Sequence, residues 1–197
     1  MSAPPAIRGF VTSMILDATR ALPDEPRRRV FALVPEPTLA LIEATSRLGW
    51  IPMDESMKLT DAIHGVLGNP GYRRFFSRLA DRIIDAPLLQ SFFDAAVRLF
   101  GLTPQALFKW STHAWDQAFR HIGRLTYQLQ REGPDGGRIE MVWEDIPPLM
   151  LRGGTFEESL AGTFEMFLRR VSREGHVRIR PASASEKSRR VYEVTWK

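Results

Sequence analysis

The spacing of apolar residues changes once along this sequence, near residue 123, and this change limits the folds that the chain can adopt. Before that point apolar side chains recur at helical spacing, as at Phe75 and Leu79. After it they alternate with polar residues, as at Leu125, Tyr127 and Leu129. Helices followed by alternating strands indicate an α+β fold.

Glycine and proline residues divide the helical region, residues 1–122, into shorter segments. Thr103-Pro104 is a typical helix start, with a capping threonine before a proline at the first helical position. The segment over 7–22 fits a strand or a helix. We predict helices over 36–48, 54–67, 72–84, 88–100 and 105–122.

The second region, residues 123–197, reads as strand, strand, helix, strand, strand. A turn over 132–137 joins the first two strands, and Thr155 and Glu158 have the spacing of a capping box that opens the helix. Two more alternating segments follow, around 177–179 and 191–196. We therefore predict a single domain, 1–197, in which N-terminal helices pack on a four-stranded antiparallel sheet of β-β-α-β-β order.

Composition excludes several classes of function. The chain has no cysteine, which excludes disulfides, thiolate catalysis and cysteine-ligated metal sites and fits a reducing compartment. No segment reaches the roughly 20 apolar residues of a membrane span, and the N-terminus lacks a signal-peptide core, so we expect a cytoplasmic protein. The net charge of +4 is spread along the chain, and short runs such as 27–29 favour solvated surface over nucleic-acid binding.

Motifs for catalysis and metal binding are sparse. His113 and His121 are two helical turns apart, but no HExxH or other tight ligand cluster occurs, and we expect no bound metal. Nucleophile-elbow and phosphate-loop motifs are also absent. Glu144 and Asp145 end a predicted strand. This pair suits acid–base chemistry with a histidine, or Asp145 simply caps the turn before Pro147.

Aromatic residues are the most suggestive feature. Trp110, Trp115 and Phe119 share one predicted helix, and Trp143 lies on a strand that follows it. These side chains fit three interpretations: plain core, the wall of an apolar pocket between helices and sheet, or an interface patch.

The C-terminal segments 139–143, 156–163, 177–179 and 192–196 resemble the end of a paralogous family of uncharacterised, chiefly myxobacterial proteins. They are more distantly similar to the haem-nitric-oxide-binding fold and the related 4-vinyl reductase domain. The resemblance implies N-terminal helices, a ligand pocket against a four-stranded antiparallel sheet, and small-molecule sensing.

The departures from that family concern its cofactor. Haem-binding members carry Tyr-x-Ser-x-Arg after the strand, where the motif holds the propionates, and the matching positions here are Trp143, Asp145 and Pro147. An acidic residue at 145 would repel a propionate, so the resemblance implies the fold without the haem.

These observations together predict a non-enzymatic, haem-free sensory or adaptor domain. It would bind a small apolar ligand or a protein partner where the helices meet the sheet, through Trp110, His113, Trp115, Phe119 and Trp143. A homodimeric interaction module and an enzyme that uses the acidic pair at 144–145 with a histidine are the alternatives. The identity of the ligand, the partner and the oligomeric state stay open.

Overall fold

A computed structural model of the chain describes residues 3–85, 90, 94, 101, 103–133, 136–171, 173–181 and 187–197. The helix predicted over 88–100 lies outside these residues, except at positions 90 and 94. Within the described part of the chain no helix is long and apolar enough to cross a bilayer.

The N-terminal region is helical, as predicted. Its helices are α1 (Gly9–Arg20), α2 (Asp24–Leu33), α3 (Glu36–Ala44), α4 (Met53–Ile84) and α6 (Pro104–Ala118). The sequence pattern missed α2, because Pro23 and Pro26 read as breaks. Pro26 lies in the first turn of α2, where a missing backbone N–H costs no helical hydrogen bond. The predicted break at Gly68 is a kink inside α4, where this glycine has a φ of 64°.

Helix α6 starts as expected and ends earlier than expected. The Thr103 hydroxyl accepts a hydrogen bond from the backbone N–H of Ala106, at 3.2 Å. The prediction placed the end near residue 122, but the backbone becomes extended at Phe119. This change has a structural cause, because Phe119 and Arg120 form strand β3, which pairs with the N-terminal strand.

A small antiparallel sheet joins three distant parts of the chain. Its strands are β1 (Ala6–Arg8), β2 (Trp50–Pro52) and β3 (Phe119–Arg120), in the order β2-β1-β3. Ile7 pairs with Ile51 on one side and Phe119 on the other, and Arg8 pairs with Trp50. Because side chains alternate along a strand, the isoleucines face the core and the arginine faces outward.

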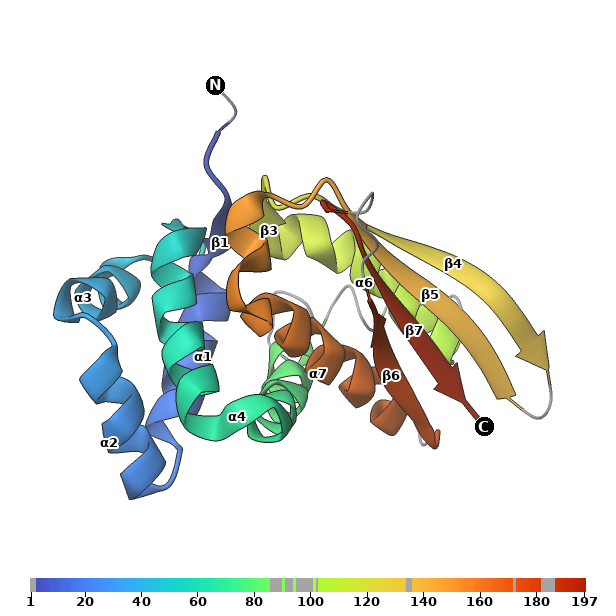
Figure 1. The fold of residues 1–197 in the computed structure, drawn as a ribbon, viewed down its shortest axis with the longest axis horizontal. Coiled ribbons are helices and arrows are strands. Elements are labelled where there is room, and N and C mark those ends of the chain that lie inside the picture. The colour runs from blue at the N-terminus through green and yellow to red at the C-terminus, as the bar shows by residue number, and fades with distance from the viewer. Residues whose placement is uncertain are drawn as a thin grey trace.

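The larger sheet confirms the predicted α+β architecture. Its four strands run in the order β4-β5-β7-β6, and every neighbouring pair is antiparallel. Helix α7 (Thr155–Arg170) follows β5 through the short 3-10 segment η1 (Pro148–Gly154) and lies between α4 and the sheet (Figure 1). The strands are β4 (Arg124–Gly133), β5 (Gly136–Glu144), β6 (Gly175–Arg180) and β7 (Arg190–Trp196).

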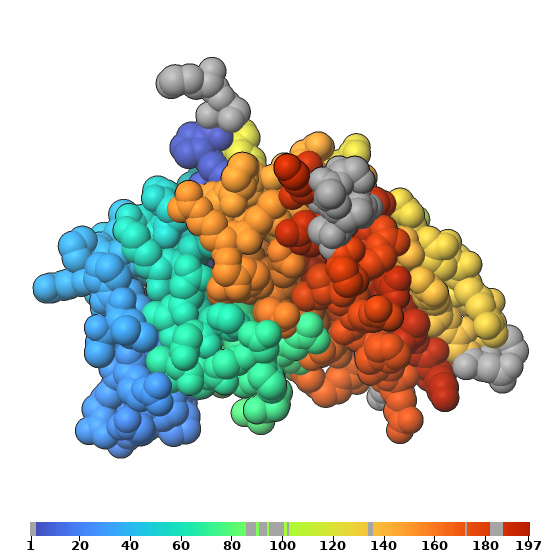
Figure 2. All heavy atoms as spheres, in the orientation of Figure 1, coloured from blue at the N-terminus to red at the C-terminus, as the bar shows by residue number. Residues whose placement is uncertain are grey.

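Helix α7 also fixes the helical half to the sheet half, which adjoin in the space-filling view (Figure 2). A glycine on α7, Gly162, lets the helix approach α4 closely, because a Cβ there would stand 2.5 Å from the Arg73 carbonyl oxygen. Arg73 forms ion pairs with Glu158 and Glu165 of α7. The relative position of α4 and α7 is therefore set by close packing and by charge.

Candidate functional site

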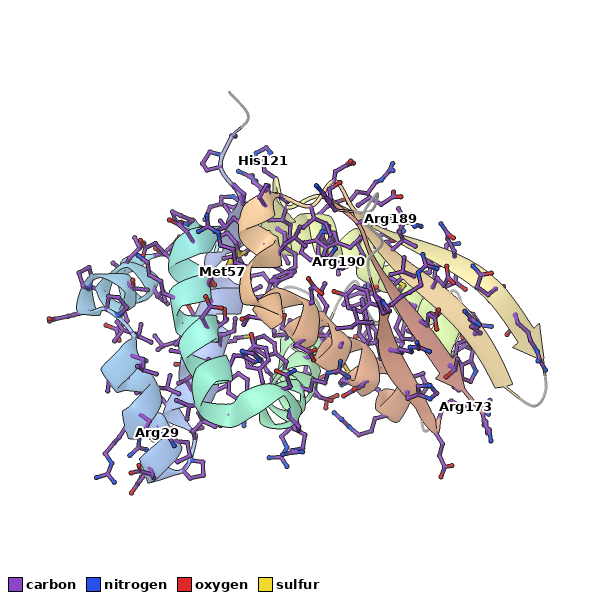
Figure 3. All side chains as sticks on the ribbon, in the orientation of Figure 1. Arg29, Met57, His121, Arg173, Arg189 and Arg190 are labelled. Carbon is purple, nitrogen blue, oxygen red and sulfur yellow. The ribbon has the colours of Figure 1, made fainter. Side chains whose placement is uncertain are left out.

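A cavity of about 140 Å³ lies where the helical half meets α7 and the sheets. Its walls come from β1, α1, α4, α6, β3, β4 and α7, so segments from nearly the whole chain must fold before it exists. The walls are mostly apolar. Side chains from four helices that contribute to it are Ile15, Met57, Phe76, Trp110, Leu160 and Phe164. Met57 is labelled on α4 beside α1 in Figure 3.

The few hydroxyl groups in the walls already form hydrogen bonds within the protein. Ser111 and Ser159 each donate to the carbonyl three residues earlier in their own helix, at 2.7 Å. Thr163 donates to the Ser159 carbonyl at 3.0 Å, and Ser56 shares a hydrogen bond with Thr12 at 3.3 Å. Since a polar ligand gains little from groups that are already paired, the walls favour an apolar occupant.

One phenol also lines the cavity. The Tyr72 side chain is buried, and this burial raises the pKa of its hydroxyl well above the usual value; a hydrogen bond with Thr60 acts in the opposite direction. Tyr72 therefore stays protonated and neutral at physiological pH.

Three of the five predicted site residues lie together in the wall. Trp110, Trp115 and Phe119 all line the cavity, and the rings of Trp115 and Phe119 stand 4.8 Å apart between centroids. The indole N–H of Trp115 donates to the Gly123 carbonyl at 3.0 Å, which fixes the ring where α6 gives way to the sheet.

The other two predicted residues lie elsewhere. Trp143 is completely buried and forms a second layer behind the wall, where its indole N–H donates to the Ile122 carbonyl at 2.7 Å. Its ring packs against Trp115 and Phe156, which do line the cavity. His113 is exposed to solvent and is not among the lining residues.

The acidic pair at the end of β5 lies outside the cavity. Glu144 forms ion pairs with Arg124 at 3.0 Å and with Arg189 at 3.6 Å. Asp145 is exposed and has a φ of 57°, which fits a turn residue. Within the described residues, neither carboxylate forms a hydrogen bond with a histidine, and no group of three potential ligands is arranged to hold a metal ion.

Comparison with solved structures finds this fold in H-NOX proteins. An Fe(II) unliganded H-NOX protein from K. algicida superposes with a TM-score of 0.60 at 9% identity, over 97% of both chains. A Cs H-NOX mutant with 4-cyano-L-phenylalanine at site 5 gives 0.62 at 12% identity, over 97% of both chains. An oxygen-binding H-NOX domain related to soluble guanylate cyclases gives 0.59 at 13% identity, over 97% of this chain and 95% of that one.

These values show that the chain has the H-NOX fold. No protein-family model matches the sequence, and no curated protein matches it. The predicted likeness to the haem-nitric-oxide-binding fold is therefore confirmed at the level of fold, while the likeness to a myxobacterial paralogous family has no support.

Haem is the cofactor that this fold implies, since one of the solved neighbours was studied for haem distortion in the H-NOX family. The described cavity residues supply neither an imidazole nor a thiolate to hold its iron. All four histidines are among the described residues and none lines the cavity, and the chain has no cysteine. The cavity volume of about 140 Å³ is also below the range of about 300–1,000 Å³ typical of pockets for drug-sized ligands.

The wall also lacks a partner for the haem propionates. No arginine, lysine or histidine is among the described lining residues, whereas a buried carboxylate needs a cation or several hydrogen-bond donors. Asp145, which occupies one of the predicted clamp positions, is acidic, and so is its neighbour Glu144. The structure thus combines the H-NOX fold with a cavity whose described lining residues include no imidazole, no thiolate and no cation.

Proposed function

We propose that this chain is a non-enzymatic, haem-free binding domain that takes up a small apolar molecule in the cavity and acts as a sensory or adaptor module. The observation that carries this proposal is the cavity itself, with a volume of about 140 Å³ and apolar walls. An engineered apolar cavity of about 150 Å³ in another protein stays dry and binds benzene or xenon. A ligand of that size and polarity suits the walls described above.

The chemistry of the walls supports binding rather than catalysis. The lining serine and threonine hydroxyls are already hydrogen-bonded within the protein, and the buried Tyr72 is held neutral. No described lining residue is a carboxylate, a histidine or a lysine that could transfer a proton. A site of this kind holds its ligand by dispersion and by exclusion of water.

Thermal denaturation in the presence of benzene, and separately under xenon pressure, tests the proposal. A ligand that binds only the folded state raises the midpoint with the logarithm of its concentration once that concentration exceeds Kd. We expect the midpoint to keep rising with the concentration of each probe, and a benzene adduct in native mass spectrometry. No rise with either probe would overturn the proposal.

A matched pair of variants on α6 assigns the effect to the cavity. Ala118 lines the cavity and is 8% exposed, whereas Ala106 is 7% exposed and does not line it. We expect Ala118→Leu to abolish the benzene-induced rise, because the added carbons occupy the ligand's space. Ala106→Leu should keep it. Equal responses in the two variants would place benzene elsewhere.

The haem-free part of the proposal has its own measurement. The protein is expressed with a haem precursor in the medium, and its absorbance spectrum is recorded after purification. We expect no Soret band in the purified protein, since the described lining residues offer neither an axial imidazole nor a propionate partner. A Soret band at one haem per chain would refute the argument from the lining residues.

A further inference from the structure

The outer face of the small sheet carries two arginines on a single tryptophan ring. The guanidinium carbon of Arg8 lies 4.0 Å from the centroid of the Trp50 ring, and that of Arg120 lies 3.9 Å from it. Both distances are within the range of cation–π contacts. Because both guanidinium carbons lie close to the centroid of the same ring, the distance between them cannot exceed the sum of these two distances.

The strand register explains why these side chains meet. Arg8 of β1 pairs directly with Trp50 of β2, and Arg120 of β3 pairs with Ala6, two residues before Arg8 on β1. Across β1, Ala6 pairs with Arg120 on one side and with Pro52 on the other, so the Arg120 side chain reaches Trp50 diagonally. The three residues therefore share the outer face of the sheet, where strand pairing holds them together.

Neutral groups hold Arg8 in place. Its Nη1 donates to the Leu48 carbonyl at 2.6 Å, and its Nε donates to the Gln117 carbonyl at 3.2 Å. These acceptors orient the guanidinium without cancelling its charge. Arg120 is exposed, and its side chain forms no hydrogen bond within the described residues.

The charges of this arginine pair are not balanced within the described part of the chain. No carboxylate there lies within 4.0 Å of either guanidinium, whereas Arg73, for example, has two carboxylate partners on α7. A guanidinium stacked on an aromatic ring keeps its in-plane N–H groups free to bind a carboxylate. The arrangement thus presents two oriented cations without a counter-charge.

The residue whose backbone carbonyl binds Arg8 also carries an exposed apolar side chain. Leu48, whose carbonyl holds Arg8, is 65% exposed and precedes β2 by two residues. Tryptophan and arginine are the residues most enriched at protein interfaces, and an exposed leucine beside them adds apolar area that can be buried.

We propose that Arg8, Trp50, Arg120 and Leu48 form a docking surface for an acidic segment of a partner protein. Carboxylates of the partner would bind the two guanidiniums, and an apolar side chain between them would cover Leu48. Charge complementarity and the exposed leucine favour a protein segment over a free phosphate, since a free phosphate gains nothing from Leu48. The surface lies on the outside of the sheet, so its occupant differs from that of the cavity.

Fluorescence anisotropy of a short, labelled peptide of alternating glutamate and leucine, added to the full chain at low ionic strength, tests this proposal. We expect binding that weakens as salt rises, because exposed charges are screened. Arg120→Gln should weaken it about fivefold, which corresponds to about 1 kcal/mol for one exposed charge pair. Since the Arg120 side chain makes no hydrogen bond within the described residues, this variant should fold normally.

Arg29→Gln is the matched control, because it also removes one exposed positive charge. Figure 3 labels Arg29 on α2, far in the view from His121, the neighbour of Arg120. We expect the control to bind like the wild type, and a peptide with glutamine in place of glutamate to bind neither protein. Inorganic pyrophosphate should compete weakly. The proposal fails if the wild type does not bind the acidic peptide, if Arg29→Gln weakens binding as much as Arg120→Gln, or if pyrophosphate binds as tightly as the peptide.

Discussion

Two buried alanines on α4 provide a test of whether the cavity is truly empty space. Ala80 lines it and is 4% exposed, whereas Ala62 is 7% exposed and packs in the core away from it. At about 24 cal/mol per Å³, a cavity of 140 Å³ lowers the free energy of unfolding by about 3 kcal/mol relative to a filled core. Leucine at position 80 adds three carbon atoms to that space.

The two leucine substitutions should change stability in opposite directions. Burial contributes about 0.8 kcal/mol per carbon, so Ala80→Leu gains about 2 kcal/mol before strain. We expect a net gain of about 1 kcal/mol, since the new side chain will not fit the walls perfectly. Ala62→Leu has no space to fill and should lower the free energy of unfolding by about 1–3 kcal/mol, the usual result of overpacking.

Urea denaturation followed by circular dichroism measures both changes, and an unchanged m-value shows that the midpoint shift reports stability. For a chain of this size 1 kcal/mol also moves the thermal midpoint by about 2–4 °C. If Ala80→Leu destabilises the protein as much as Ala62→Leu does, side-chain motion already fills the cavity and the proposed binding site does not exist.

Three further predictions follow from particular side chains. The Tyr192 hydroxyl is buried without a hydrogen-bond partner within the described residues, so Tyr192→Phe should raise the free energy of unfolding by about 1 kcal/mol in urea titrations; a loss would reveal a bound water. Gly162→Ala should lower the thermal midpoint despite its better helix propensity, because the new Cβ would stand 2.5 Å from the Arg73 carbonyl oxygen; a higher midpoint would mean that the α4–α7 contact yields easily. Hydrogen bonds from Lys58 and Thr38 lower the pKa of Glu55, so its contribution to stability is present above the usual glutamate pKa of about 4.3 and is lost as the pH falls through the lowered value. Glu55→Gln should flatten the acid limb of the stability profile measured by urea denaturation, and an unchanged acid limb would contradict this assignment.

The four-stranded sheet was predictable from the sequence because its strands are long enough to show alternation. β5 and β7 carry inward side chains at every second position, such as Met141 and Tyr192. The small sheet was not predictable. Its strands are two or three residues long, too short to show a period, and β1 pairs with β3 across more than 100 residues of sequence. The early end of α6 was not predictable for the same reason, because it ends where the two-residue strand β3 begins.

The site was predictable in part. The aromatic stripe on the helix predicted over 105–122 indicated Trp110, Trp115 and Phe119, because bulky rings on one helix face must meet another layer. The contributions of α1 and α4, such as Ile15 and Met57, carried no separate signal. A helical stripe that borders empty space has the same spacing as one that borders packed atoms, so periodicity cannot locate a cavity.

The small sheet has two faces, and their proximity has a thermodynamic consequence. Ile7 lines the cavity, and the next residue, Arg8, stacks on Trp50 outside. Phe119 and Arg120 repeat this pairing on β3. One peptide bond thus separates each cavity residue from its neighbour on the outer face. A ligand in the cavity that shifts β1 or β3 would therefore also shift Arg8 or Arg120. If both proposed sites bind, any factor by which a molecule inside changes the partner's affinity is also the factor by which the partner changes that molecule's affinity.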